Sequence, residues 1–497
     1  MSDHLVHSGH RLHVLLALLI ECMFVHGYAA KSLLVANIVS IPKNLSKSLC
    51  KIDNYRGIAL CSSICKLIDL IVLRKFPSEL AASELQFGFK QCHSTAMCTA
   101  VYKEVISHYV NKGSEVYSVL LDASKAFNKV HHGKLFKLLI SRGVPHAVIR
   151  LMYDSYRRQT MFASWKSSNS RSFQVQNGVK QGAILSPILF TVYIDELLCR
   201  LKESGVGCHL DGVYAGALGY ADDVTLLCAS LRGLNKMLET CEKFAEEFDL
   251  TFNATKSIGI HFGQMKDFDG FAELNGSRIQ WADNVKHLGN WISANLRDTK
   301  DCEAKLSHFI GSVNRVVGNF GSTSYSTKSK LFNTYCSSFY GSQVWLLNST
   351  DIEKCYIKWN KAVHTLLNLP FRAHTWCLGP LIGRIHLRGQ LHVREWKFLK
   401  GLLRCRNNLV RSVVLNAYHD ARGPIGQNIA YLRHLYGISV TDDFRSGLNA
   451  IRSCFSLNVD NEHVVETVKE LLSCKDGLLE VNLSKEEIST VISSLVC

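Results

Sequence analysis

The chain has 497 residues, of which 47% are hydrophobic and 20% are charged, and this balance excludes an intrinsically disordered protein. Its 57 lysines and arginines outnumber its 42 acids, which gives a formal net charge of +15. Such an excess predicts a polyanionic partner, with nucleic acid favoured over an anionic membrane. The length predicts about two to four domains.

Eighteen cysteines are scattered along the chain, and no C-x-x-C spacing occurs. Disulfide-rich folds are mostly small and secreted, and structural zinc sites usually have closely spaced ligand pairs. The nearest approach to such a pair is His374 and Cys377. We therefore expect free thiols in a reducing compartment and no structural zinc.

Near the N-terminus, residues 12–25 (LHVLLALLIECMFV) form an apolar run. It is shorter than the ~20 apolar residues that cross a membrane, and Glu21 interrupts it. Its length is also that of a signal-peptide core, but the preceding residues lack the usual cluster of positive charge. We favour a buried helix of a globular domain over a signal peptide and expect no membrane partner.

Further along, alternating strand and helix patterns continue to about residue 293. We expect strands over 33–43, 117–121, 257–262 and 285–293, and a hairpin over 212–228. A turn is expected at 54–57, followed by helical spacing over 58–73, and further helices over 135–140, 148–156, 231–248 and from Ser186 onward. Interleaved strands and helices predict an α+β domain.

Beyond residue 300 helical patterns dominate, and residues 354–411 hold twelve basic side chains against one acid, Glu395. We expect this stretch to contact phosphates without reading sequence, since a solvated surface usually mixes both charges. Residues 460–487 are acidic and precede a last short helix. The basic residues are Lys354, Lys358, Lys361, Arg372, Arg384, Arg388, Arg394, Lys397, Lys400, Arg404, Arg406 and Arg411.

Three carboxylates stand out for their placement. Asp222 and Asp223 separate the two apolar runs of the expected hairpin, and Asp122 ends an apolar strand. Taken alone, the pair could be a polar turn and Asp122 a helix cap. Carboxylates held together near a buried surface need a counter-cation, and three of them can hold two Mg²⁺ ions about 4 Å apart.

Eight ordered blocks connect these residues to a known family. The sequence resembles the reverse transcriptase domain of a non-LTR (LINE-type) retrotransposon polyprotein. The blocks are IPK at 41–43, DNYRGIAL at 53–60, LQFGFKQCHST at 85–95, LLDASKAFNKVHH at 120–132, NGVKQGAILSPILFTVYIDEL at 177–197, GYADD at 219–223, FNATKS at 252–257 and VKHLGNWIS at 285–293.

The resemblance implies roles at matching positions. Asp122, Asp222 and Asp223 would bind two Mg²⁺ ions, helped by the Ala123 carbonyl. Phe127 would lie beneath the sugar and reject a 2′-OH, although plain core packing would also explain it.

The nucleotide-binding roles are implied in the same way. Arg56 would clamp the incoming triphosphate, with Lys43 a weaker candidate. Gln181 and Gly182 would line the nucleotide pocket and template strand, and Lys256 would protonate departing pyrophosphate. Without the family, Arg56 and Lys256 would be ordinary surface charges. The HLGNWI stretch at 287–292 resembles the primer grip.

For the whole molecule, the resemblance implies an α+β right-hand polymerase with fingers, a palm built on a split β-α-β sheet, and a helical thumb. We expect 1–29 as an N-terminal helical segment of the fingers, 30–293 as fingers and palm, 294–411 as the thumb and basic nucleic-acid-binding region, and 412–497 as a helical, acidic extension. The implied partners are an RNA template, a DNA primer and dNTPs. The implied location is intracellular, in the nucleus.

Some positions depart from the family pattern. Asn128, Ala183 and Gly57 replace a usual Asp, Gly and Pro, and we expect the family's upstream endonuclease and C-terminal zinc knuckle to be missing. None of these three substitutions touches Asp122, Asp222 or Asp223, so the function expected first is RNA-directed DNA polymerase. The alternative is a degenerate, truncated copy that only binds nucleic acid. An intron maturase or an RNA-dependent RNA polymerase fits the motif spelling less well.

Overall fold

The computed structural model describes residues 6–264, 270–370 and 372–456, together with 462, 465, 466, 468 and 469. At its centre lies a five-stranded sheet in the order β14-β11-β3-β10-β9, here called the palm sheet. The central strand β3 pairs antiparallel with both β10 and β11. The strands are β3 (Val116–Leu121), β9 (Ala217–Tyr220), β10 (Asp223–Cys228), β11 (Ile258–Phe262) and β14 (Gln280–Trp281).

Three helices that pack on the palm sheet begin where their sequences supply a helix start. The side chains of Ser94 and Ser230 accept backbone N–H bonds at the starts of α4 and α9. Pro187 lies in the first turn of α8, where its missing N–H leaves no bond unmade. The helices are α4 (Thr95–Asn111), α8 (Ser186–Glu203) and α9 (Leu231–Glu247).

A second sheet, here called the fingers sheet, has the order β2-β1-β4-β5, with β6 also paired to β4. Residues 54–60 differ from the sequence prediction, because a strand replaces the turn and the start of the helix. The extended backbone of β2 is fixed along its whole length by antiparallel pairing with Asn37 to Pro42 of β1. The strands are β1 (Val35–Pro42), β2 (Tyr55–Leu60), β4 (Thr160–Trp165), β5 (Ser168–Asn169) and β6 (Phe173–Gln174).

Further helices lie before and between these strands in the chain, and the N-terminal one is less buried than the sequence suggests. The helix expected over 12–25 exists, but it buries only Ile20 and Met23 and leaves Leu15 and Leu18 exposed. The helices are α2 (His10–His26), α3 (Ser63–Lys75), α5 (Ala126–Lys129), α6 (His132–Ser141) and α7 (His146–Arg157). The single-turn 3-10 helices are Lys31–Leu33 and Ile52–Asn54.

Short hairpins complete the palm. The expected strand over 285–293 is two strands, β15 and β16, because Leu288 and Gly289 both have positive φ and turn the chain back. The remaining strands are β7 (His209–Leu210), β8 (Val213–Tyr214), β12 (Glu273–Leu274), β13 (Ser277–Arg278), β15 (Asn284–His287) and β16 (Asn290–Ser293).

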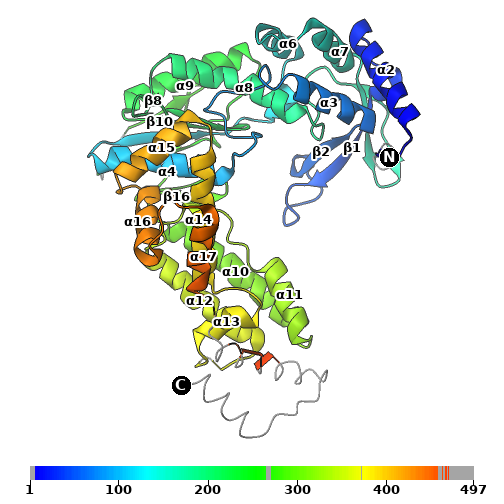
Figure 1. Cartoon of the computed structure of the whole chain (residues 1–497). Coiled ribbons are helices and arrows are strands. Elements are labelled where there is room, and N and C mark those ends of the chain that lie inside the picture. The colour runs from blue at the N-terminus through cyan, green and yellow to red at the C-terminus, as the bar shows by residue number, and fades with distance from the viewer. Residues whose placement is uncertain are drawn as a thin grey trace.

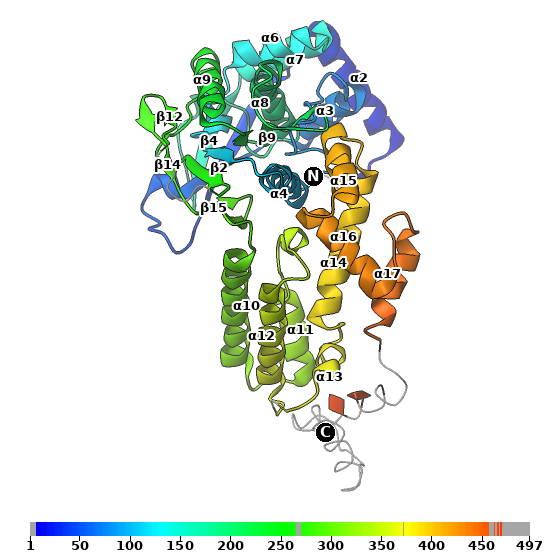
Figure 2. The same ribbon diagram turned by 90° about the vertical axis from the view of Figure 1, so that its left-hand side faces the viewer.

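After residue 298 the described chain forms helices and no strands, as the sequence predicts. Four helices pack side by side as a bundle, α10 (Thr299–Phe320), α11 (Tyr325–Tyr335), α12 (Thr350–Leu367) and α13 (Thr375–Leu381) (Figure 2). The last four are α14 (Leu387–Arg404), α15 (Asn408–His419), α16 (Pro424–Tyr436) and α17 (Phe444–Ser453), and a 3-10 turn covers Ser342–Val344. The predicted helix near residue 490 lies outside the described residues.

The elements follow an arc, with α2, α3, β1 and β2 at one end and α10 to α13 at the other (Figure 1). The chain then returns, because α15 and α16 lie beside α4 at the palm (Figure 2). The predicted mixed α+β fold with a helical C-terminal region is thereby confirmed. None of the described helices combines the length and apolar run that crossing a bilayer would take.

Candidate active site

The three predicted carboxylates lie at one end of the palm sheet. β9 and β10 form a tight hairpin in which Tyr220 pairs with Asp223, so that Ala221 and Asp222 make the turn. β10 pairs with β3 through Val224 and Leu121. The next positions outward in this register are Asp223 and Asp122, which therefore face each other across the two strands.

These acids act on one another electrostatically. Partial burial raises the pKa of Asp223 to about 6, with further rises from Asp222 and Asp122. Burial also raises the pKa of Asp222, and Asp122 adds to the rise while the positive charge of Arg56 offsets part of it. The site is therefore a cluster of mutually repelling negative charges, which a bound cation would stabilise.

The donors at this site suit a hard divalent cation, since the three predicted side chains offer carboxylate oxygens and no thiol or imidazole. Within the described ranges, no three His, Cys, Asp or Glu side chains are grouped closely enough to hold a metal ion by themselves. A metal here would be held by Asp122, Asp222 and Asp223 together with oxygen ligands from outside the chain.

The backbone around Asp122 is fixed from the segment that precedes β11. The Asp122 N–H donates to Ser257 Oγ at 3.1 Å, and the Asn253 N–H donates to the Asp122 carbonyl at 2.9 Å. Ala123 forms a bridge with Phe252. The same segment carries Lys256, whose Nζ lies 3.7 Å from Asp122 Oδ2 on a largely exposed side chain. Lys256 thus lies beside the Asp122 carboxylate.

A cavity of about 170 Å³ opens beside the carboxylates and is lined by Asp122, Asp223, Lys256 and the β15–β16 turn. That turn is anchored by His287, which is buried, stacks on Tyr102 at 4.8 Å and shares a hydrogen bond with Thr99 Oγ1 at 3.0 Å. Burial lowers the pKa of His287 to about 3, so the ring is neutral. The hairpin expected to grip the primer is therefore fixed to α4.

On the fingers, the two expected phosphate ligands are exposed. Arg56 lies on β2. Its positive charge lowers the pKa of Asp222 and so offsets part of the rise that burial causes. Lys43 follows β1, where its backbone N–H and its Nζ donate to the carbonyls of Asn54 and Asp53 at 2.6 and 2.9 Å. Lys43 therefore holds the β1–β2 loop, whereas the charge of Arg56 acts on the Asp222 carboxylate.

The loop before α8 lies against β2. The Ala59 N–H donates to the Gln181 carbonyl at 2.6 Å. Gly182 has φ +111, and a Cβ there would lie 2.9 Å from the Ala59 carbonyl oxygen. Only glycine fits this backbone and this close approach.

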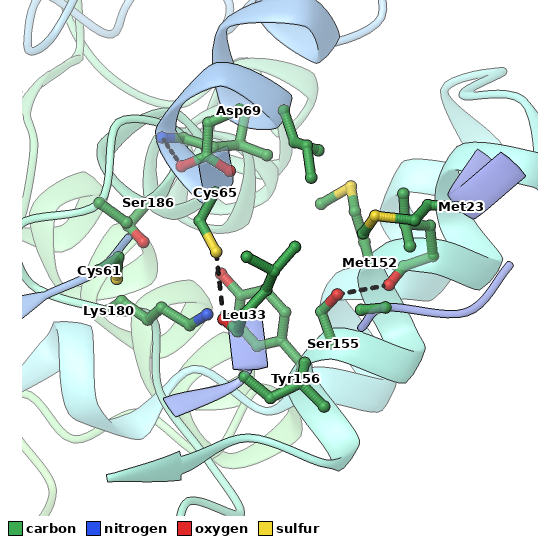
Figure 3. Close-up of a pocket in the computed structure, with 16 residues that line it drawn as sticks. Met23, Leu33, Cys61, Cys65, Asp69, Met152, Ser155, Tyr156, Lys180 and Ser186 are labelled. Carbon is green, nitrogen blue, oxygen red and sulfur yellow. Dashed lines mark hydrogen bonds between the residues drawn. The ribbon is translucent and has the colours of Figure 1, made fainter. Parts of the chain in front are cut away.

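Asp69 on α3 holds the other end of that loop (Figure 3). It accepts the N–H of Leu185 at 3.2 Å, just before α8 begins. Burial raises the pKa of Asp69, and Lys180 at the same small cavity lowers it in part. A carboxylate at a helix N-terminus is favourable, and here it joins α3 to the loop that carries Gln181 and Gly182.

Phe127 is half-buried and packs between other rings. It stacks on Phe190 with centroids 4.4 Å apart and meets Phe89 edge-on at 6.4 Å. Its packing role is thus evident, and its position on α5, five residues after Asp122, keeps it close to the carboxylates.

The five basic residues singled out on or before α14 divide into two groups. Lys400 is buried and donates to the carbonyls of Val440 and Asp442, and Arg394 donates to Ser342 Oγ at 2.7 Å and to the Phe339 carbonyl. These two side chains hold the protein together, which a charge count along the sequence cannot reveal.

The other three face outward. Lys397 and Arg384 are exposed, although Arg384 also donates to the Asn333 carbonyl at 3.2 Å, and Arg388 is half-buried in an ion pair with Glu353 at 2.6 Å. Phosphate contacts therefore remain open to Arg384 and Lys397, and to Arg388 once its partner is displaced.

Sequence reasoning missed three polar residues around the site, of which Gln86 and Asp195 are buried and Asp69 is half-buried. Gln86 contacts the turn that carries Asp222, Asp69 holds the loop before α8, and Asp195 on α8 accepts the Ser83 N–H at 2.9 Å and pairs with Arg142 at 3.0 Å. The only signal was a polar side chain within an apolar run, which local patterns do not connect to a partner.

Comparison with known proteins agrees with this geometry. Residues 41–292 match the family described as reverse transcriptase (RNA-dependent DNA polymerase). Over 242 residues the chain is 28% identical to the retrovirus-related Pol polyprotein from type-2 retrotransposable element R2DM of Drosophila melanogaster, a match that covers 48% of this chain and 22% of that protein. Over 378 residues it is 24% identical to the RNA-directed DNA polymerase from mobile element jockey of the same fly, covering 72% of this chain and 40% of that protein.

Among solved structures, apo telomerase from Candida tropicalis is similar with a TM-score of 0.43 and 11% identity, covering 92% of this chain and 73% of that one. The chain spans less than half the length of either fly relative. The family match nevertheless covers just over half of the chain itself. The chain therefore belongs to the reverse transcriptase (RNA-dependent DNA polymerase) family and is related to the polymerases of non-LTR retrotransposons such as R2 and jockey.

Proposed function

We propose that this chain is an RNA-directed DNA polymerase of a LINE-type retroelement. The primer 3′-hydroxyl attacks the α-phosphate of a dNTP chosen by an RNA template, and pyrophosphate leaves. The observation that carries the proposal is the pairing of β3 with β10, which brings Asp122 opposite Asp223 with Asp222 in the adjoining turn. Its location would be the nucleus, because members of the resembled family prime synthesis at chromosomal DNA.

In this proposal the three aspartates hold two Mg²⁺ ions, which when bound would activate the hydroxyl and neutralise charge on the transferring phosphate. Arg56, with its planar fork of donors, clamps the triphosphate, and Lys43 keeps the β1–β2 loop in place. Lys256 beside Asp122 donates a proton to the leaving pyrophosphate.

Selectivity falls to the parts around the carboxylates. Phe127 rejects a ribose 2′-OH, while Gly182 lets the backbone of its loop approach the template base. Exposed Arg384 and Lys397, with Arg388, contact duplex phosphates, which gives affinity without sequence preference. Arg394 and Lys400 have internal roles instead.

Primer extension on an RNA template with Mg²⁺ and dNTPs tests the proposal. We expect Asp122→Asn and Asp222→Asn each to lower the extension rate by about 100-fold or more, because the charge that balances the metal ions is removed. A matched control is Asp211→Asn, which changes an exposed carboxylate at the tip of another hairpin, β7–β8, and should extend like wild type.

Extension that survives Asp222→Asn unchanged would refute the assigned site. Wild-type protein that binds primer–template in a salt-sensitive manner but extends nothing would instead identify a degenerate, nucleic-acid-binding copy, which the departures at Asn128, Ala183 and Gly57 make the natural alternative.

A further inference from the structure

A short segment ahead of α4, residues 85–89, runs along the edge of the palm sheet. The Phe87 N–H donates to the Gly219 carbonyl at 2.7 Å, and the Gly219 N–H donates to the Leu85 carbonyl at 2.8 Å. Gln86 and Gly219 thereby form a parallel bridge beside β9. This pairing brings the Gln86 side chain next to the turn that joins β9 to β10.

The Gln86 carboxamide binds both polar groups of a single residue in that turn. Its Oε1 accepts the Ala221 N–H at 2.9 Å, and its Nε2 donates to the Ala221 carbonyl at 3.4 Å. Oε1 also accepts the Gly88 N–H at 2.9 Å. Gln86 is fully buried, so water cannot replace these bonds.

Ala221 needs such support, because its φ is +58. A non-glycine residue in the left-handed region costs roughly 1–2 kcal/mol relative to ordinary backbone. The next residue is Asp222, followed by Asp223, and both carboxylates are repelled by each other and by Asp122 across the strands. Residues 221–223 thus combine a strained backbone at Ala221 with two mutually repelling carboxylates.

Two glycines make the close approach possible. A Cβ on Gly88 would lie 2.4 Å from the Ala221 nitrogen, and a Cβ on Gly219 would lie 3.0 Å from Gln86 Nε2. Gly88 does not have positive φ, so only the contact with the turn requires glycine at that position. The segment and the turn are therefore shaped to each other.

We infer that Gln86 is a positioning residue of the polymerase site: its carboxamide fixes the Ala221 peptide and so holds Asp222 and Asp223 where they can share metal ions with Asp122. This inference rests on the proposed function for its catalytic consequence. Its structural part, that Gln86 controls the metal affinity of the carboxylates, stands apart from polymerisation.

Gln86→Met tests the inference, since methionine keeps the length and shape of the side chain and removes the carboxamide. We expect kcat for primer extension to fall about 100-fold, with KM for dNTP changed by about twofold at most, because a small misplacement of catalytic groups has effects of this size. The Mg²⁺ concentration for half-maximal rate should rise several-fold, roughly as expected for weakened carboxylate ligation.

A matched control and a second variant separate positioning from loss of folding. Gln159 is also a buried glutamine, with an Nε2 that donates no hydrogen bond within the described chain, so Gln159→Met should behave like wild type. Gly88→Ala leaves Gln86 intact but pushes on the Ala221 nitrogen, and should reproduce the altered Mg²⁺ dependence.

Mn²⁺ binding, followed by electron paramagnetic resonance on the full chain without nucleotide, supplies a readout besides activity. Weaker Mn²⁺ binding by Gln86→Met and Gly88→Ala than by Gln159→Met would support the inference even if wild type extended no primer, in which case only the polymerase proposal would fail. Equal Mn²⁺ binding by all three, or wild-type Mg²⁺ dependence in Gln86→Met, would overturn it.

Discussion

Asp223, the first residue of β10, has an exposed side chain and is repelled by the carboxylates of Asp222 and Asp122. Its raised pKa, about 6 against 3.8 for a free side chain, arises from partial burial and from Asp222 and Asp122. An acid with a raised pKa in the folded state destabilises that state wherever it is ionised, and the penalty disappears once it is protonated in both states. The candidate active site is thus a local source of instability.

We therefore expect Asp223→Asn to stabilise the metal-free protein while abolishing extension. Because the exposed side chain is screened by solvent, the gain at pH 7 should be no more than about 1 kcal/mol. It should be full above pH 6 and vanish as the pH falls from about 6 towards 3.8, where the wild-type acid becomes protonated. Chemical unfolding of both proteins in EDTA across this range would measure it, and a gain that persists at pH 4 would contradict the assignment.

At this scale the sequence predicted the charged residues better than the neutral ones. Asp122, Asp222 and Asp223 stand in recognisable motifs at the ends of apolar runs, and the strand register brings them together. Gln86 stands in the quoted block LQFGFKQCHST, but its partner is 135 residues away. A hydrogen bond to a distant backbone leaves no periodic pattern, so its role became visible only in the structure.

Among the elements, α4 is the one on which the others converge. Twelve successive residues, from Ala96 to Ser107, are buried, and two of them are charged. Lys103 pairs with Asp298 at 2.7 Å just before α10, and also donates to the Val344 carbonyl at 2.7 Å. Glu104 accepts the Ile425 N–H at 3.0 Å at the start of α16. Buried charges thus tie the palm to both parts of the helical region.

Removing one member of this buried pair should be costly. We expect Lys103→Met to lower the free energy of unfolding by about 3 kcal/mol or more, because Asp298 would stay buried without a counter-charge. Lys354→Met, which breaks a 3.3 Å pair between the exposed Lys354 and the half-buried Asp351, should change it by about 0.5 kcal/mol at most. Chemical denaturation followed by circular dichroism compares the two variants, and equal effects would show that the buried pair has no special weight.

Elements were predictable from periodicity where their own sequence determined their conformation, as for α8, α9 and the β9–β10 hairpin. They were mispredicted where a neighbour decided the outcome. β2 is extended because β1 pairs with it, although its sequence resembles a turn leading into a helix. Lys400 is buried because residues 440–442 cover it, although a basic helix suggests a solvated face.

For the whole molecule, a net charge of +15 should make nucleic-acid binding depend steeply on salt. We expect Arg384→Ala and Lys397→Ala each to reduce the slope of log affinity against log salt by about 1, because each side chain would neutralise one phosphate. Lys236→Ala, on the exposed side of α9, should leave the slope unchanged. Fluorescence anisotropy of a labelled RNA–DNA duplex at several salt concentrations would measure this.

A slope that is flat in wild type, or equal in all of these variants, would remove the basic region from the duplex-binding surface. In that event the duplex phosphates would be bound by other exposed basic side chains, such as those of the β1–β2 loop.

The return of α15 and α16 onto α4 also bears on what folds as a unit. The family match ends at residue 292, yet the helices that cover one side of α4 come from residues 408–436. A fragment cut at the end of the match would expose apolar side chains of α4 to water and leave Glu104 without its partner at Ile425. The boundary recognised by homology and the boundary of cooperative folding are therefore different places in this chain.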